Sequence, residues 1–228
     1  MKILALIPAR AGSKGVPNKN LQEINGKSLV QICIETAQQV TEIDEIFVSS
    51  DSERILSLSA HCGASLIKRS AEVSGDKSRA EAVVEHFFQY VNGRFREPIL
   101  LVYLQPTSPF NTSDSIRECI NLYLENSHPV VSVKKIEEFP EKMLTLDKKG
   151  RLAPFLPGAE ATINRQELSE RLIPTGAIYV FSEENFNESK NIPVSGALPC
   201  VVSGKESLDI DSELDLEIAR KMGRVNEL

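Results

Sequence analysis

The sequence contains no tryptophan and three histidines in 228 residues, and its four cysteines are widely spaced. No Cys-x-x-Cys pair or neighbouring histidine is present, which excludes the usual zinc and dithiol motifs and predicts reduced, mostly buried thiols. No apolar run is long enough to span a membrane. The first ten residues lack the long apolar core and small-residue cleavage site of a secretory signal. These absences predict a cytoplasmic protein with no membrane partner.

An excess of positive charge is also missing. The chain has 26 lysines and arginines against 32 acidic residues, a net charge of −6. This balance argues against a general affinity for nucleic acid, so a phosphate site would need a local basic cluster. The chain is long enough for one α/β domain with a substantial core, because 41% of its residues are hydrophobic.

Apolar runs of strand length alternate with amphipathic segments of helical length. This alternation predicts a Rossmann-like three-layer sandwich with a mostly parallel central sheet. We expect helices beginning near Ser28 and spanning about 52–61, 79–91, 113–125 and 212–222. We expect strands at 3–7, 45–49, 65–67, 99–104, 130–133, 177–181 and 199–202.

The alternation breaks between residues 139 and 171. Two apolar stretches, 143–146 and 152–155, flank the turn sequence Asp-Lys-Lys-Gly, which favours a β-hairpin. We therefore expect a single nucleotidyltransferase domain over 1–228 in which 139–171 is a dimerisation hairpin insertion. A hairpin of this kind offers a free edge for pairing, so we expect a homodimer.

A long polar segment, PARAGSKGVPNKN, follows the first predicted strand and carries Arg10, Lys14 and Lys19. Connections of this type are usually about two to six residues long, so a much longer one is often functional. Glycines allow backbone N–H groups to turn toward an anion, and the three cations would compensate a polyphosphate. The loop is neither a Walker A motif nor a G-x-G-x-x-G motif. A solvated surface loop remains the alternative.

Two aspartates near the end of the chain, Asp209 and Asp211, are separated by one residue. On an extended segment their side chains face the same way, about 7 Å apart at the backbone. Mg²⁺ typically uses one or two carboxylates together with substrate phosphate oxygens. Ser212 and Asp215 resemble a capping box for the following helix. Ordinary helix capping is the alternative explanation for these acids.

Four collinear segments resemble motifs of the acylneuraminate cytidylyltransferase family. Residues 7–20 match its opening motif, IPARxGSKGxxxKN, throughout, and QPTSP at 105–109 resembles its second. NRQ at 164–166 with GAIY at 176–179 resembles the third, and LDIDSELDL at 208–216 the last. Two departures stand out, since the family often has Arg where this chain has Asn111 and usually Asn where it has Thr175.

The resemblance implies roles for individual residues. The CTP phosphates and ribose would contact Arg10, Ser13, Lys14, Lys19 and Asn20, and the cytosine side would contact Arg69 and Asp76. The sugar would contact Gln105, Lys142 and Arg165, with Arg165 suited to a carboxylate. Mg²⁺ would be the cofactor, bound by Asp209 and Asp211.

The reaction that the resemblance implies joins CMP from CTP to the anomeric hydroxyl of a nine-carbon N-acylneuraminate-type sugar and releases pyrophosphate. Arg10 and Lys14 would stabilise the leaving group, and either the metal or Asp211 would assist loss of the hydroxyl proton. None of the histidines falls in a motif.

Several alternatives remain open at this point. The sugar could be Kdo, legionaminic acid or pseudaminic acid, because each presents a carboxylate next to its anomeric carbon. A nucleotide-sugar glycosyltransferase also uses an Asp-x-Asp metal site, although usually in mid-chain. A nucleotide-binding dimer without catalysis is the third possibility.

Overall fold

A computed structural model describes residues 1–13, 15–70, 79–136, 139–159, 162, 164, 166 and 169–224. The main strands are β1 (Lys2–Pro8), β4 (Glu45–Ser50), β5 (Ser65–Lys68), β6 (Ile99–Leu104), β7 (Val130–Lys135), β10 (Leu172–Ser182) and β11 (Leu198–Val201). The helices are α1 (Leu29–Gln38), α2 (Glu53–His61), α4 (Ala80–Val91), α5 (Ser113–Asn126), α6 (Glu183–Ser189) and α7 (Glu213–Arg224). The short elements are β2 (Glu23–Ile24), β3 (Lys27–Ser28), β8 (Leu144–Leu146), β9 (Leu152–Pro154), and the 3-10 turns η1 (Lys19–Leu21), η2 (Pro140–Lys142) and η4 (Gly204–Ser207).

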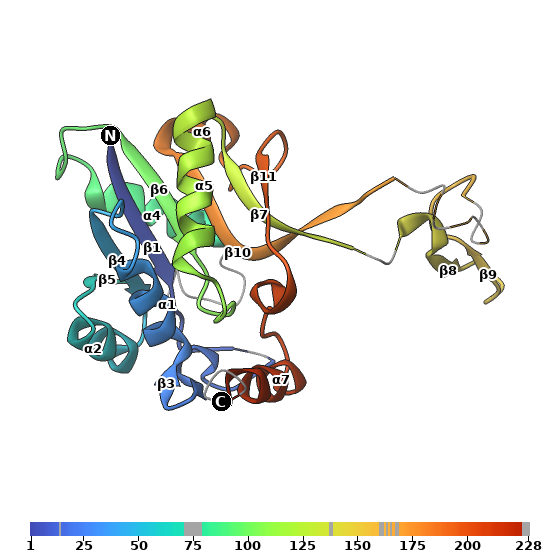
Figure 1. Cartoon of the computed structure of the whole chain (residues 1–228), viewed down its shortest axis with the longest axis horizontal. Coiled ribbons are helices and arrows are strands. Elements are labelled where there is room, and N and C mark those ends of the chain that lie inside the picture. The colour runs from blue at the N-terminus through green and yellow to red at the C-terminus, as the bar shows by residue number, and fades with distance from the viewer. Residues whose placement is uncertain are drawn as a thin grey trace.

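The central sheet has seven strands in the order β11-β7-β10-β6-β1-β4-β5. All neighbouring pairs are parallel except those of β10, which is antiparallel to both β6 and β7. The sheet is therefore mixed but mostly parallel, as predicted (Figure 1). A register shift between Pro174 and Tyr179 interrupts the pairing of β10 with β7.

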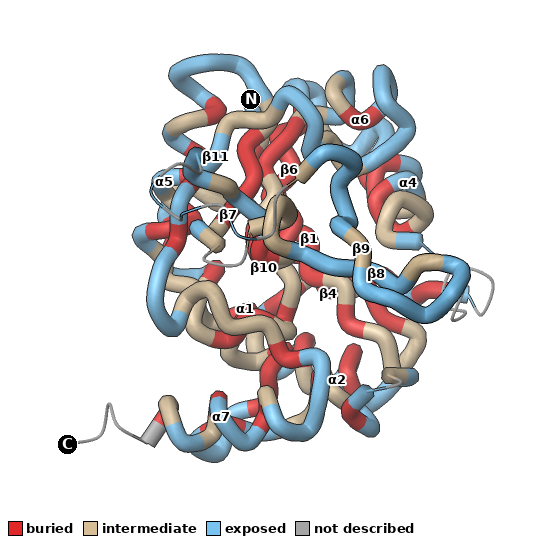
Figure 2. The backbone as a smooth tube through the Cα atoms, turned by 90° about the vertical axis from the view of Figure 1, so that its right-hand side faces the viewer, coloured by how far each residue is buried: buried red, intermediate tan, exposed pale blue. Residues whose placement is uncertain are grey.

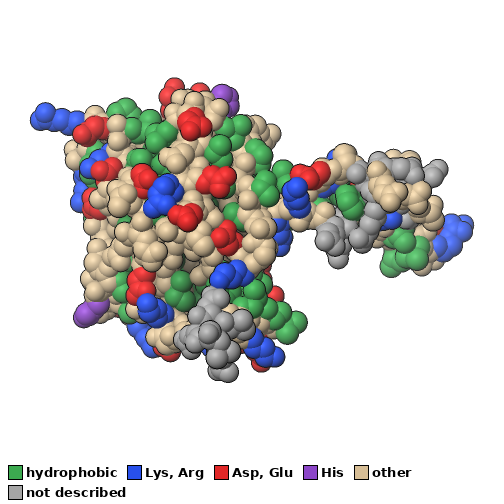
Figure 3. Space-filling view, viewed as in Figure 1, with side chains coloured by type: hydrophobic (Ala, Val, Ile, Leu, Met, Phe, Trp, Pro, Cys, Tyr) green, Lys and Arg blue, Asp and Glu red, His purple; other side chains and the backbone are tan. Residues whose placement is uncertain are grey.

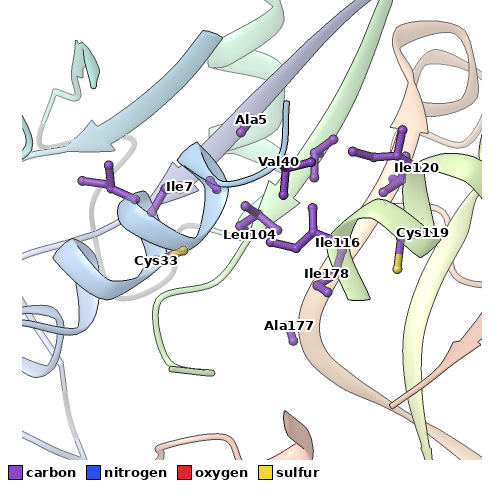
Figure 4. Packing of buried hydrophobic residues seen from close by; sticks show 14 of the residues in the cluster. Ala5, Ile7, Cys33, Val40, Leu104, Ile116, Cys119, Ile120, Ala177 and Ile178 are labelled. Carbon is purple, nitrogen blue, oxygen red and sulfur yellow. The ribbon is translucent and has the colours of Figure 1, made fainter. Parts of the chain in front are cut away.

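Two helical layers cover the sheet because successive strand residues face opposite sides. On one face Ala5 and Ile7 pack with α1, α2 and α5. Figure 4 shows Cys33 of α1 and Ile116 and Ile120 of α5 in this cluster. On the other face the core includes side chains of α4 and α6. Figure 2 shows the buried strands enclosed by these layers. The predicted three-layer sandwich is confirmed.

Most predicted elements form close to the expected bounds. Ser28 caps α1 by accepting a hydrogen bond from the Gln31 N–H, and β6 spans the predicted residues 99–104. Every residue of β6 is buried, which explains its continuous apolar sequence. β10 is longer than the predicted 177–181, and α6 was not predicted at all.

Residues 139–159 lie on an arm that extends from the ends of β7 and β10, away from the body (Figures 1 and 3). Within this arm, β8 pairs with β9 as an antiparallel hairpin. Its dimerisation role stays a prediction. Across the described residues, no helix is both long and apolar enough to cross a membrane.

Candidate active site

A cavity of about 360 Å³ opens beyond the carboxyl ends of β1, β5 and β6. Ligands of open α/β sheets gather at this edge, and the volume falls within the usual range for small-molecule sites. The cavity is lined by Pro8, Arg10, Ser13, Gly15, Lys19, Asn20, Arg69, Arg79, Ala80, Val83, Tyr103, Gln105, Pro106, Thr107 and Asp211. Among the described residues, four cations and one carboxylate therefore line it, an arrangement suited to a polyanion.

The loop after β1 is held in shape by its own contacts and by the strand beside it. The Asn20 side-chain amide donates to the carbonyl oxygen of Arg10 at 3.0 Å. The Ala11 N–H donates to Asp51 Oδ1 at 2.9 Å, just after β4 ends. Both contacts fix the backbone near Arg10, which lines the cavity. Asp51 is a positioning residue that the sequence analysis missed.

Lys19 joins this loop to the end of the chain. Its Nζ donates to the carbonyl oxygen of Ile210 at 2.7 Å and to Asp211 Oδ1 at 3.1 Å. The Lys19 side chain is mostly covered, whereas that of Asp211 is 79% exposed. The ammonium group therefore neutralises the exposed acid and holds residues 210–211 against the loop. Basic and acidic motifs from opposite ends of the sequence thus meet at one cavity, as expected.

Arg69 is the most unusual cation in the cavity wall. It is only 6% exposed, yet its Nε and Nη2 atoms have no hydrogen-bond partner among the described residues. Burial lowers the pKa of its guanidinium, and the nearby charge of Arg10 acts in the same direction. Leaving buried donors unpaired costs free energy. These N–H groups are therefore available to an acceptor that enters the cavity.

Asp209 and Asp211 occupy different environments. Asp209 is half-buried, and burial raises the pKa of its carboxyl above the ordinary value of 3.8, with Asp211 raising it further. A hydrogen bond from Thr107 opposes this shift. Even so, Asp209 Oδ1 is buried and has no hydrogen-bond partner in the described part of the chain. An unsatisfied carboxylate oxygen beside a second acid fits a divalent cation, which would supply the missing positive charge.

The glycine that opens the GAIY segment of the third predicted motif lies close to this acid. Gly176 has a φ of +80°, and a Cβ there would lie 3.8 Å from Asp209 Oδ2. A residue with a side chain would be strained in this conformation. The bulge in β10 therefore brings its backbone close to the Asp209 carboxylate.

The predicted site residues separate into three groups. The cavity brings together Arg10, Ser13, Lys19, Asn20, Arg69, Gln105 and Asp211. Asp209 is two residues before Asp211 in the sequence but is not among the lining residues. Lys142 lies in η2 on the arm. Lys14, Asp76 and Arg165 lie outside the described residues.

Sequence reasoning missed two polar side chains among the lining residues. Arg79 precedes α4 as its N-cap residue, and Tyr103 is a buried residue of β6. Neither belongs to a distinctive motif. In the sequence, Tyr103 is indistinguishable from the other core residues of β6. Only the position of β6 next to the cavity shows that Tyr103 lines it.

Of the two departures from the family pattern, Thr175 is buried and Asn111 is half-buried. The Thr175 Oγ1 lies 2.6 Å from Ser132 Oγ within the irregular part of β10. The Ser132 hydroxyl also accepts from the Ile178 N–H at 2.9 Å. Asn111 faces a small apolar space next to α1 and α5. Neither residue lines the 360 Å³ cavity.

Comparisons with known proteins agree with this geometry. Residues 4–190 match the family model described as cytidylyltransferase. An N-acylneuraminate cytidylyltransferase of Escherichia coli O18:K1:H7 is 32% identical over 220 residues, covering 96% of this chain and 51% of the relative. The chain thus spans about half the length of that relative. A CMP-N,N'-diacetyllegionaminic acid synthase of Legionella pneumophila is also 32% identical, covering 100% of this chain and 98% of the relative.

A more distant relative and a solved structure extend the comparison. A pseudaminic acid cytidylyltransferase of Campylobacter jejuni is 26% identical, with 99% of this chain and 98% of the relative covered. The structure of a CMP:2-keto-3-deoxy-manno-octonic acid synthetase complexed with CTP aligns over 100% of both chains. Its TM-score is 0.72 at 17% identity, a likeness of fold alone.

Proposed function

This chain belongs to the cytidylyltransferase family, and from that premise we propose that it transfers CMP from CTP to a nonulosonic acid. The observation that carries the proposal is the cavity that joins residues 10–20 to Asp211 and presents four cations. Three relatives that act, by their names, on acylneuraminate, diacetyllegionaminic acid or pseudaminic acid support this sugar class.

In the proposed reaction the anomeric hydroxyl of the sugar attacks the α-phosphorus of CTP. A new phosphorus–oxygen bond forms, the bond to the β-phosphate oxygen breaks, and pyrophosphate leaves. Positioning and charge stabilisation dominate catalysis of this type. Arg10 and Lys19 would bind the phosphates, together with Lys14, whose proposed role rests on the opening motif. Ser13 and Asn20 would orient the phosphates and ribose.

The cytosine of CTP and the acceptor sugar would contact different walls of the cavity. Arg69 offers two unpaired N–H donors to the cytosine side, where Asp76 is proposed from its sequence position. Gln105 follows β6 and would contact the sugar. Arg165 is proposed as the partner of the sugar carboxylate from its motif.

We propose Mg²⁺ as the cofactor, held by Asp209 and Asp211. When bound, the ion would neutralise phosphate charge and increase the acidity of the attacking hydroxyl. The described lining residues include no histidine, and Asp211 is the carboxylate among them. We therefore assign to Asp211 the role of accepting the hydroxyl proton.

We also propose that the protein is a cytoplasmic homodimer joined through the arm. Large apolar side chains on the arm are exposed, among them Leu146 at 66%, Leu152 at 71% and Phe155 at 58%. Several large exposed apolar side chains on one short hairpin favour an interaction site. Lys142 lies on the same arm and would then act at the site of the neighbouring subunit.

The test is a panel of sugars assayed for CTP-dependent pyrophosphate release with Mg²⁺. The panel contains N-acetylneuraminate, N,N'-diacetyllegionaminic acid, pseudaminic acid and Kdo, and the CMP-sugar product is identified by mass. Turnover of one of the three nonulosonic acids supports the proposal, and a preference for Kdo reassigns the sugar. Release of nucleoside diphosphate from a sugar nucleotide would instead indicate a glycosyltransferase. CTP binding without turnover on any sugar would indicate a non-catalytic nucleotide-binding protein.

A further inference from the structure

The two acids of the proposed metal site lie on a segment outside the sheet. It connects β11, which ends at Val201, to α7, which begins at Glu213. Such a connection is held only by its individual contacts, and a metal site requires its ligands to be fixed. The contacts of this segment therefore bear on how well Asp209 and Asp211 are placed.

One end of the segment is anchored beside β6. The Ile210 N–H donates to the carbonyl oxygen of Thr107 at 2.9 Å, and the Thr107 side chain hydrogen-bonds Asp209. Ile210 is fully buried between the two acids. These contacts fix the backbone at the acids but leave the preceding turn, η4, to be held by other residues.

Glu206 in η4 supplies that second anchor. Its Oε2 accepts a hydrogen bond from Ser115 Oγ at 2.6 Å, and its Oε1 accepts one from Thr112 Oγ1 at 3.1 Å. Thr112 is the N-cap of α5, and Ser115 is buried in the first turn of that helix. Hydroxyl hydrogen bonds to a carboxylate are short and strong, and a helix N-terminus favours negative charge.

Glu206 lies three residues before Asp209 in the sequence, and both of its carboxylate oxygens are bound at the start of α5. The same loop, residues 105–112, carries Thr107 at one end and Thr112 at the other, so it contacts the acidic segment twice. The Glu206 side chain does not line the cavity. It acts on the site only through the backbone that it holds.

We propose that Glu206 is a positioning residue for the divalent-cation site, holding Asp209 and Asp211 in place through its bonds to Ser115 and Thr112. This inference rests on the proposed metal site. Outer contacts that orient metal ligands typically change metal affinity by roughly 10- to 100-fold when they are removed. Glu206 is absent from the sequence motifs, and only the fold places it against α5.

The test measures metal binding without turnover. Mn²⁺ binding to the full chain is followed by the electron paramagnetic resonance of free Mn²⁺, with CTP present and no sugar. We expect Glu206→Ala to weaken Mn²⁺ binding by about tenfold, and CTP binding measured in EDTA to stay within about twofold of wild type. Glu206→Gln should recover part of the loss, because its side-chain oxygen can still accept one bond. Glu125→Ala, a change at an exposed position of α5, is the control.

A second variant tests the route of the effect. Ser115→Ala removes the shorter of the two hydrogen bonds to Glu206, and Glu206→Ala removes the same bond. The double variant should therefore bind Mn²⁺ no more weakly than Glu206→Ala alone. Wild-type Mn²⁺ affinity in Glu206→Ala would overturn the inference and leave the proposed function standing. Equal loss of Mn²⁺ and CTP affinity in both Glu206 variants would also overturn it, since that pattern means general misfolding. Failure of the wild-type chain to bind Mn²⁺ with CTP would instead reject the metal site itself.

Discussion

Gly15 and Asp211 approach so closely that a Cβ on Gly15 would lie 2.0 Å from the carbonyl oxygen of Asp211. Real side chains do not make such contacts, so the basic loop and the acidic segment can meet in this way only because residue 15 is glycine. The glycine of the opening motif therefore permits a contact between the two ends of the sequence. Phosphate binding is not needed to explain it.

Gly15→Ala should separate the loop from residues 210–211. Overpacking of this kind typically costs about 1–3 kcal/mol, and we expect a lower melting temperature together with weaker CTP binding. Gly12→Ala is the control for stability, since a Cβ at Gly12 meets nothing within 4 Å. Thermal unfolding of the two variants provides the measurement. Equal melting temperatures would contradict the contact.

Arg69→Met should separate stability from ligand binding. The change removes two unpaired buried donors and a buried charge, so the unliganded protein should melt at the same or a higher temperature. CTP affinity should fall roughly 10- to 100-fold, because hydrogen bonds from charged groups are worth about 1.5–3 kcal/mol. Calorimetric titration in EDTA measures the affinity. Lys68→Met, an exposed neighbouring change, should leave it unaltered, and unchanged CTP binding in Arg69→Met would remove Arg69 from the site.

Asp209→Asn should stabilise the metal-free protein at neutral pH. The pKa of Asp209 is raised in the folded state, so the folded state binds its proton more tightly than the unfolded state does. Its contribution to stability is therefore present below the ordinary pKa of 3.8 and is lost as pH rises through the folded pKa. The difference in unfolding free energy between wild type and Asp209→Asn should change across that window. Urea unfolding at a series of pH values measures it, and a pH-independent difference would contradict the shift.

The same substitution should abolish metal-dependent activity. We expect Mn²⁺ affinity to fall by more than about a hundredfold, since even outer contacts change affinity by about 10- to 100-fold. In the wild-type protein, acidification through the pKa of Asp209 should weaken Mn²⁺ binding, because the protonated carboxyl is a poor ligand. Asp215 provides a contrast, because hydrogen bonds from Ser212 and the Asp211 backbone lower its pKa. Wild-type Mn²⁺ affinity in Asp209→Asn would reject the ligand assignment.

Charges on the arm should disrupt the proposed dimer. Leu146→Asp combined with Leu152→Asp places carboxylates at two of the most exposed apolar positions of the hairpin. Sedimentation should then show a single chain where the wild type shows two. Leu124→Asp, at a 49% exposed leucine on α5, is the matched control. A wild-type chain that sediments as a monomer would reject the dimer.

Sequence reasoning succeeded where one interaction decided the local structure. The continuous apolar run of β6 gave its bounds, and Ser212 with Asp215 forms the predicted cap, since the Ser212 N–H donates to Asp215 Oδ2 at 2.8 Å. The basic and acidic motifs were correctly expected to meet, because parallel strands place their following loops at one edge of the sheet.

It failed where distant contacts decided the outcome. The polar sequence of α6 buries only Phe186, and a capping box between Ser182 and Asn185 begins the helix. The start of β10 contains Pro174 and Gly176, which individually disfavour strands, yet pairing with β7 and the Thr175 contact with Ser132 hold it there. The side chains of Asp51 and Glu206 have roles that only the folded chain reveals.

The bond between Lys19 and Asp211 spans 192 positions of sequence. During synthesis the loop that carries Lys19 emerges early, and it cannot acquire its acidic counterpart until Asp211 has left the ribosome. The wall of the cavity is therefore complete only after Asp211 has been added to the growing polypeptide. Incomplete chains ending before residue 209 would carry the cations of the cavity wall without Asp209 and Asp211, so Lys19 would lack its ion-pair partner.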